Sequence, residues 1–321
     1  MSDTPKQERK SETEPSVWSR AQEQARLLPT PPVAPPAKSV AAEACAQAGR
    51  GLASAARAAG RSIASACRSV DPDVYRHVAQ LPLMGLTMLS SRWMPARALP
   101  PDGQRPVVFV HGLGGSRGNF LPMQTWFRLQ GRSRLYGVGL DSGASIELLG
   151  ERLRAFVSEV LAINDLPTDA QVDLVTHSMG GLVARFALED PETEQRVACL
   201  LTLGAPHAGS HAARYLATAQ ALGIRPNSPL LERLSGQAPW RLRTRLVCFW
   251  SRADVLILPA ESAQFEGAEN RELEGLTHYG YLLRPTSWRQ VADALRPAPR
   301  LGLSESLLSG PGPSSGALPS V

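Results

Sequence analysis

A strand, a tight turn and a helix in quick succession constrain the fold of this chain more than any other feature. Apolar residues over 172–175 indicate the end of a buried strand, and apolar residues recur at helical spacing over 182–187. Only a very tight turn fits between them, with Ser178 at its apex. Its hydroxyl would stand at the helix N-terminus, where unpaired N–H groups and a partial positive charge favour an oxyanion. Gly180 and Gly181 remove side chains where helix and sheet come close. The stretch therefore predicts a strand–nucleophile–helix elbow.

One position of this elbow departs from the usual G-x-S-x-G pattern. Thr176 occupies the place of the first glycine, close to the backbone of the turn, where a smaller residue is the norm. The alternative interpretation is a helix whose first turn reads Ser-Met-Gly-Gly by chance. We expect the threonine to be tolerated and favour the elbow.

Length and composition set broad limits. The chain has 321 residues, enough for one large α/β domain with extensions. The chain is weakly basic, with a net charge of +5 and a pI near 9.3. This excess of basic residues is too small, and too scattered along the chain, to predict nucleic-acid binding. No apolar stretch has the length of a transmembrane helix, and the N-terminus lacks the apolar core of a secretory signal. We expect a cytoplasmic, reduced protein.

The cysteines give no sign of a metal or cofactor site. The four cysteines, Cys45, Cys67, Cys199 and Cys248, do not have the spacing of a metal ligand set. Cys199 and Cys248 fall inside apparent buried strands, where cysteine is usually a small apolar residue. We expect no cofactor and no bound metal.

The first hundred residues predict two extensions. Residues 1–37 are mixed-charge and then proline-rich, which predicts a disordered arm. Residues 38–100 predict a helical extension. Its part over 38–70 is rich in alanine, and four arginines share one helical face: Arg50, Arg57, Arg61 and Arg68. A basic amphipathic helix can contact an anionic membrane, but a solvated helix or linker is the favoured interpretation, because alanine buries little area and three glycines weaken the helix.

The rest of the extension carries a helix start and an apolar run. Asp71 and Pro72 are a suitable N-cap and first helical residue. The apolar residues over 72–94 should pack against the main domain, with a part in an acyl-chain tunnel as the less favoured alternative. Pro82 should split them into two helices.

Residues 101–297 predict the main domain, an α/β domain in which strands and helices alternate. This alternation indicates a mostly parallel sheet covered by helices on both faces. The expected strands cover 107–110, 134–138, the elbow strand, 197–203 and 245–250, and a further element covers 271–276. The expected helices cover 121–129, 145–163, the elbow helix, 211–222, 230–234 and 287–295. Residues 208–241 interrupt the rhythm and predict either a lid or ordinary surface structure. Residues 298–321 predict a disordered tail.

A glycine-rich turn follows the first strand of this domain, over 111–116. Its spacing fits neither G-x-G-x-x-G nor the Walker pattern with its lysine, so a phosphate loop is not predicted. We expect an oxyanion hole instead, formed by the backbone N–H of Leu113 and that of Met179, the residue after the nucleophile.

A serine nucleophile requires a base and an acid that orients the base. In a fold with this elbow the acid and then the histidine follow the serine along the chain. Asp254 comes just after a strand and His278 lies in a later loop. Glu261 is an alternative acid that lies farther from the strand end. Four other histidines are expected to be structural: His111, His177, His207 and His211.

The ordered set of motifs resembles the α/β-hydrolases, and most of all small bacterial triacylglycerol lipases and esterases. The resemblance covers about 107–295 and is carried by residues 110–115, 176–181 and 203–210 together with Asp254 and His278. It implies an α/β-hydrolase fold with a small lid insertion. It also implies a serine hydrolase acting on esters, with Ser178, Asp254 and His278 as its triad.

Three functional hypotheses remain open. The favoured one is a lipase or esterase, whose partner is a small ester or lipid. A second is thioester hydrolysis or acyl transfer on the same triad. A third is a non-catalytic binding module with this fold, against which the complete triad argues. Acyl-chain length and oligomeric state are not predicted.

Overall fold

The computed structural model describes residues 71–89, 97–236 and 243–296. The expectations for the arm over 1–37, the basic stretch over 38–70 and the tail over 298–321 lie outside the described residues. Within the described ranges, none of the helices combines the length and hydropathy that a bilayer crossing requires.

The described residues form a six-stranded sheet with the order β2-β1-β3-β4-β5-β6, in which every neighbouring pair is parallel. The strands are β1 (Val107–Val110), β2 (Leu135–Gly137), β3 (Val172–His177), β4 (Val197–Leu203), β5 (Arg245–Trp250) and β6 (Glu269–Glu272). Strands buried on both faces read as continuous apolar runs, which is why β1, β4 and β5 have the predicted bounds.

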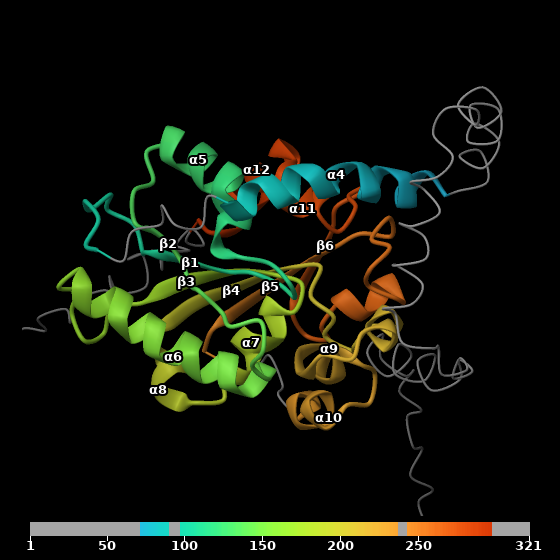
Figure 1. The fold of residues 1–321 in the computed structure, drawn as a ribbon. Coiled ribbons are helices and arrows are strands. Elements are labelled where there is room, and N and C mark those ends of the chain that lie inside the picture. Colours follow the sequence, from blue (N-terminus) through green and yellow to red (C-terminus); the bar gives the residue numbers. More distant parts are fainter. Residues whose placement is uncertain (1–70, 90–96, 237–242, 297–321) are drawn as a thin grey trace, which may run out of the picture.

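Helices cover both faces of the sheet (Figure 1). On one face lie α6 (Ile146–Ile163), α7 (Gly180–Ala187) and α8 (Pro191–Gln195), and on the other lie α5 (Leu121–Leu129), α11 (Gly280–Leu283) and α12 (Pro285–Ala294). Alternate residues of β1 serve the two cores, since Val108 packs in the core with α6 whereas Phe109 packs in the core with α5. The predicted doubly wound α/β sheet is therefore confirmed.

The helix that precedes the sheet, α4 (Pro72–Leu89), differs from its prediction. Asp71 caps it as expected, because its carboxylate accepts a hydrogen bond from the N–H of Asp73 at 2.7 Å. Pro82 does not split the helix, which continues through it. The carbonyl that loses its partner belongs to Val78, on the exposed face, where water can replace the missing hydrogen bond.

The packing of α4 is also less complete than predicted. Met84 is buried in the core beneath it, together with His77 and Thr87. Its outer side remains exposed, with several large apolar side chains in contact with solvent: Val74, Tyr75, Val78, Leu81, Leu83, Leu86 and Met88. Residues 90–94 of the predicted run lie outside the described residues.

The segment after β4 contains three short helices where two were predicted. The predicted helix over 211–222 is divided into η3 (His211–Tyr215) and α9 (Ala219–Ile224). Leu216 has an extended backbone, and the Thr218 side chain caps α9 by accepting from the N–H of Ala221, which fixes a new helix start. The third helix, α10 (Pro229–Ser235), agrees with its prediction.

Candidate active site

Ser178 lies in the predicted elbow, between β3 and α7. Its backbone φ of 54° is left-handed, a conformation that costs a non-glycine residue about 1–3 kcal/mol. A Cβ on Gly180 would lie 2.5 Å from the carbonyl oxygen of Val110, and one on Gly181 would lie 2.4 Å from the Cβ of Ala205. Both glycines are therefore needed where α7 approaches the sheet, as the sequence predicts.

Thr176 is accommodated beneath the elbow. Its side chain is fully buried, and its hydroxyl donates a hydrogen bond to the carbonyl of Leu201 at 3.2 Å. Because that carbonyl satisfies the hydroxyl, the larger residue at this position carries no unpaired polar group.

The structure brings His278 and Asp254 together. Asp254 follows β5, and His278 lies in the loop between β6 and α11. The two carboxylate oxygens lie 2.9 and 3.1 Å from Nδ1 of His278, and both side chains are buried. Glu261, the alternative acid, lies on η5 (Ala260–Ala263) with a partly exposed side chain that faces Arg252 at 3.8 Å.

The carboxylate of Asp254 is fixed by more than the histidine. Its Oδ1 also accepts the backbone N–H groups of Leu256 at 3.0 Å and Ile257 at 3.3 Å. Hydrogen bonds to a carboxylate are stronger than those between neutral groups, so they hold the side chain in one orientation. Nδ1 of His278 is consequently the protonated nitrogen, and Nε2 is left as the basic one.

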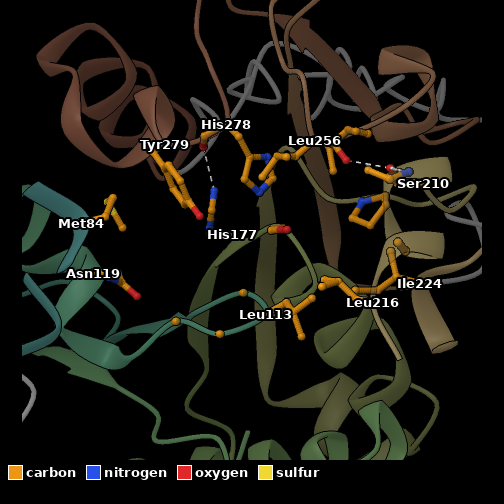
Figure 2. Close-up of a pocket in the computed structure, with 18 of the residues that line it drawn as sticks. Met84, Leu113, Asn119, His177, Ser210, Leu216, Ile224, Leu256, His278 and Tyr279 are labelled. Atoms are coloured by element: carbon orange, nitrogen blue, oxygen red, sulfur yellow. Dashed lines mark hydrogen bonds between the residues drawn. The ribbon is translucent and has the colours of Figure 1, made fainter. Parts of the chain in front are cut away.

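Ser178 and His278 line one cavity of about 350 Å³ (Figure 2). Its lining is mostly apolar, and the apolar members come from α4, the turn after β1, the segment after β4 and the loop after β5: Met84, Met88, Leu113, Pro206, Ala212, Ala213, Leu216, Ile224, Leu256 and Ile257. The predicted nucleophile and base thus face a space suited to an apolar group.

The turn over 111–116 packs directly against Ser178. A Cβ on Gly112 would lie 2.8 Å from the Cβ of Ser178. The backbone N–H groups of Leu113 and Met179 donate to no carbonyl of the described residues, as oxyanion donors require. His111 braces this turn as expected, with Nδ1 3.0 Å from the carbonyl of Gly112 and Nε2 accepting the N–H of Leu140 at 3.3 Å.

His177 is structural, but it lies closer to the site than the sequence indicated. Its Nε2 donates to the backbone carbonyl of His278 at 2.9 Å, and the two rings are 4.5 Å apart. Burial lowers the pKa of His177 well below 6.5, and the charge that His278 can carry lowers it further. His177 is therefore neutral and supports the backbone of the predicted base.

The other two histidines lie outside the cavity. His207 is fully buried, with Nε2 3.1 Å from the hydroxyl of Thr202, and burial lowers its pKa well below 6.5. His211 pairs with the guanidinium of Arg214 at 2.6 Å. Both have the structural roles that the sequence predicted.

Several residues around the site were not anticipated. His77 and Gln80 of α4 contact the loop that carries His278. Thr87 of α4 contacts Asn119, which lies beside the turn over 111–116. No motif marks them, and their partners lie up to 202 positions away in the chain, as for His77 and Tyr279. Only the apolar run of α4 gave a signal, for which core packing was favoured over the alternative of an acyl-chain tunnel.

Known sequences that are similar to this chain include bacterial triacylglycerol lipases. Residues 147–219 match the family model of a PGAP1-like alpha/beta domain. A triacylglycerol lipase of Burkholderia plantarii is 31% identical over 150 residues, which are 43% of this chain and 40% of the relative. A triacylglycerol lipase of Pseudarthrobacter phenanthrenivorans is 32% identical over 119 residues, 35% of this chain and 36% of the relative. The chain thus spans less than half the length of both relatives.

Solved structures show the same fold at lower identity. The mature lipase of Bacillus licheniformis superposes with a TM-score of 0.53 at 18% identity, over 62% of this chain and 94% of that protein. Lipase B of Aspergillus fumigatus superposes with a TM-score of 0.50 at 19% identity, over 60% of this chain and 52% of that protein. The chain therefore has the α/β-hydrolase fold, and in sequence it is similar to bacterial triacylglycerol lipases.

Proposed function

We propose that this protein is a carboxylic-ester hydrolase of the lipase and esterase type. The observation that carries the proposal is the Asp254–His278 pair beside Ser178 on one apolar cavity. In this proposal Ser178 is the nucleophile, His278 is the general base and Asp254 holds the base. The similarity to triacylglycerol lipases supports the same assignment.

The first half of the proposed reaction forms an acyl-enzyme. Nε2 of His278 takes the proton of the Ser178 hydroxyl as its oxygen bonds to the ester carbonyl carbon. The carbonyl oxygen becomes an oxyanion, which the N–H groups of Leu113 and Met179 stabilise. Losing one such donor costs about 3–4 kcal/mol in related enzymes. His278 then gives the proton to the departing alcohol as the C–O bond breaks.

The second half of the reaction restores the enzyme. His278 takes a proton from water as the water oxygen attacks the acyl carbon, and the same two N–H groups stabilise the second oxyanion. The bond to Ser178 breaks, the serine oxygen regains the proton from His278, and the carboxylic acid leaves. Asp254 stays ionised throughout and stabilises the imidazolium in each half.

The cavity supports an ester with an apolar acyl chain as the substrate. One wall is formed by the segment after β4, through Ala213, Leu216 and Ile224. This segment covers the carboxyl edge of the sheet, so we assign residues 208–241 the role of a lid, of which 208–236 are described. The proposal keeps a cytoplasmic location, with contact to an anionic lipid surface through the arginines of 38–70 as the less favoured alternative.

Hydrolysis of p-nitrophenyl esters from acetyl to palmitoyl tests the proposal. We expect Ser178→Ala to lower kcat by more than about 10³-fold while circular dichroism and the thermal midpoint remain those of a folded protein. Ser235→Ala, which changes an exposed serine at the end of α10, is the matched control and should retain full activity. A fluorophosphonate should label the wild type and the control but not Ser178→Ala.

Two outcomes would contradict the proposal. Full activity of Ser178→Ala would exclude Ser178 as the nucleophile. A folded wild type that hydrolyses acyl thioesters or transfers acyl groups to alcohols, but hydrolyses no oxygen ester, would replace ester hydrolysis by the alternative reactions on the same triad.

A further inference from the structure

Helix α4 precedes the first strand of the sheet, yet one of its faces is turned toward the active site. His77, Gln80, Met84 and Thr87 follow one another at steps of three and four residues and so share one side of the helix. Three of them are buried, although most of the helix is exposed. Each contacts a group that belongs to the site or its supports.

The N-terminal half of α4 holds the loop that carries His278. The hydroxyl of Thr277 donates to Oε1 of Gln80 at 2.7 Å. The ring of His77 stacks on Tyr279 with centroids 4.8 Å apart and planes 21° apart. These contacts fix the residues immediately before and after the base.

The C-terminal half of α4 holds the turn over 111–116, which carries the proposed oxyanion donor Leu113. The Thr87 hydroxyl donates to the carbonyl of Met84 at 2.7 Å and accepts from the side-chain amide of Asn119 at 3.1 Å. The other end of that amide accepts the backbone N–H of Ser116 at 2.6 Å. A Cβ on Gly115 would lie 2.7 Å from the same amide oxygen, so the turn packs closely on Asn119.

The space between these two attachments belongs to the cavity. Met84 and Met88 line it, and Figure 2 shows Met84 on the same side as Asn119 and Tyr279. Helix α4 therefore extends from the loop that carries His278 to the turn that carries Leu113. The two loops follow β1 and β6, which β3, β4 and β5 separate in the sheet, and α4 contacts the surroundings of both.

We propose that Gln80 and Thr87 are positioning residues, through which α4 sets the place of His278 relative to the Leu113 N–H. This inference rests on the proposed function, since it assigns α4 a part in that reaction. Loss of one neutral hydrogen bond changes stability only modestly. A displacement of about 1 Å at the reacting groups, in contrast, can lower the rate about 100-fold.

The test compares variants that remove a hydrogen-bonding side-chain group with variants that keep it. Thr87→Val removes the hydroxyl and Thr87→Ser retains it. Thr277→Val and Thr277→Ser form the same comparison at the other attachment, and Gln80→Leu removes the acceptor there. The substrate is p-nitrophenyl acetate, whose acyl group is too short to need the methionine-lined part of the cavity.

We expect Thr87→Val, Thr277→Val and Gln80→Leu to lower kcat about 10- to 100-fold with KM changed less than about twofold. The two serine variants should keep kcat within about threefold of the wild type. Gln80→Leu combined with Thr277→Val should be no slower than the slower single variant, because both remove one interaction. Leu86→Ala, on the exposed face of α4, is the control and should leave kcat unchanged.

The inference is overturned if the valine and leucine variants lower only the thermal midpoint, with kcat per folded molecule unchanged. It is also overturned if the serine variants lose as much activity as the valine variants. Failure of the proposed function gives a different result, because Ser178→Ala would then keep its activity whatever the α4 variants do.

Discussion

Replacement of Asp254 by asparagine separates the electrostatic role of this carboxylate from its structural role. In the wild type Oδ1 accepts two backbone N–H groups, from Leu256 and Ile257, and Oδ2 faces Nδ1 of His278 at 2.9 Å. An asparagine has the same shape but only one accepting oxygen. Its orientation therefore decides the state of the histidine.

Hydrogen-bond energies favour one orientation of the asparagine. With its oxygen toward Leu256 and Ile257, two buried N–H groups remain satisfied, and the NH₂ group faces His278. The reverse orientation would leave those two N–H groups without an acceptor, at about 1–3 kcal/mol each. We therefore expect Nδ1 of His278 to become the acceptor and Nε2 to carry the proton, so that it can no longer take one from Ser178.

The expected loss follows from this change of tautomer. The same exchange in a serine protease triad lowers kcat about 10⁴-fold, which corresponds to about 5.4 kcal/mol of activation free energy. The free energy of unfolding should fall by only about 1–3 kcal/mol, because the two N–H groups keep a neutral acceptor in place of a charged one. The variant should thus be folded and nearly inactive.

Steady-state hydrolysis of p-nitrophenyl butyrate and urea unfolding measure the two effects. Glu261→Gln is the matched control, because it neutralises the other acid that the sequence offered. The partly exposed ion pair of Glu261 with Arg252 contributes about 1 kcal/mol or less to the free energy of unfolding. The kcat of Glu261→Gln should therefore equal that of the wild type. A kcat for Asp254→Asn within tenfold of the wild type would refute the tautomer argument.

Two further predictions concern stability. Gly181→Ala should cost about 1–3 kcal/mol in urea unfolding, because the new methyl group would lie 2.4 Å from the Cβ of Ala205. Adding Ala205→Gly should recover part of that loss, and simple additivity of the two changes would contradict the contact. Acid should also destabilise the protein, because burial lowers the pKa of five histidines in the folded state: His77, His111, His177, His207 and His211. Below about pH 6.5 the unfolded chain binds protons at these histidines more readily than the folded chain does. The free energy of unfolding is therefore highest above about pH 6.5 and falls below it, by up to about 1.4 kcal/mol per pH unit for each histidine. Urea unfolding at pH 7, 6 and 5 measures this slope, and a flat profile would show that the histidines charge in the folded state.

The parts of the fold that could be predicted are those with local causes. The apolar runs of β1, β4 and β5 are bounded by polar or turn-forming residues, so their ends are visible in the sequence. The elbow was predictable for a similar reason, since its glycines, serine and flanking apolar residues all lie within sixteen positions. Chain order then indicated Asp254 and His278, and the structure brings their side chains together.

The parts that could not be predicted depend on distant contacts. Pro82 predicted a break in α4, but the helix continues through it. The carbonyl of Val78 lies on the exposed face of the helix, and the opposite face packs on the core. The split between η3 and α9 depends on one extended residue, Leu216, and on a threonine cap. The bond between Gln80 and Thr277 joins residues 197 positions apart, and neither residue belongs to a motif.

This division between local and distant causes has a functional consequence. The sheet brings Ser178, Asp254 and His278 to its carboxyl edge, as the alternation of parallel strands requires. The walls of the cavity come instead from α4 and from the segment after β4, neither of which belongs to that alternation. Substitutions in those two walls can change the shape of the cavity without touching Ser178, Asp254 or His278. Under the proposed function, the reaction type would follow from the motifs of the sheet, whereas the choice of acyl group would depend on segments whose sequences carry the weaker signal.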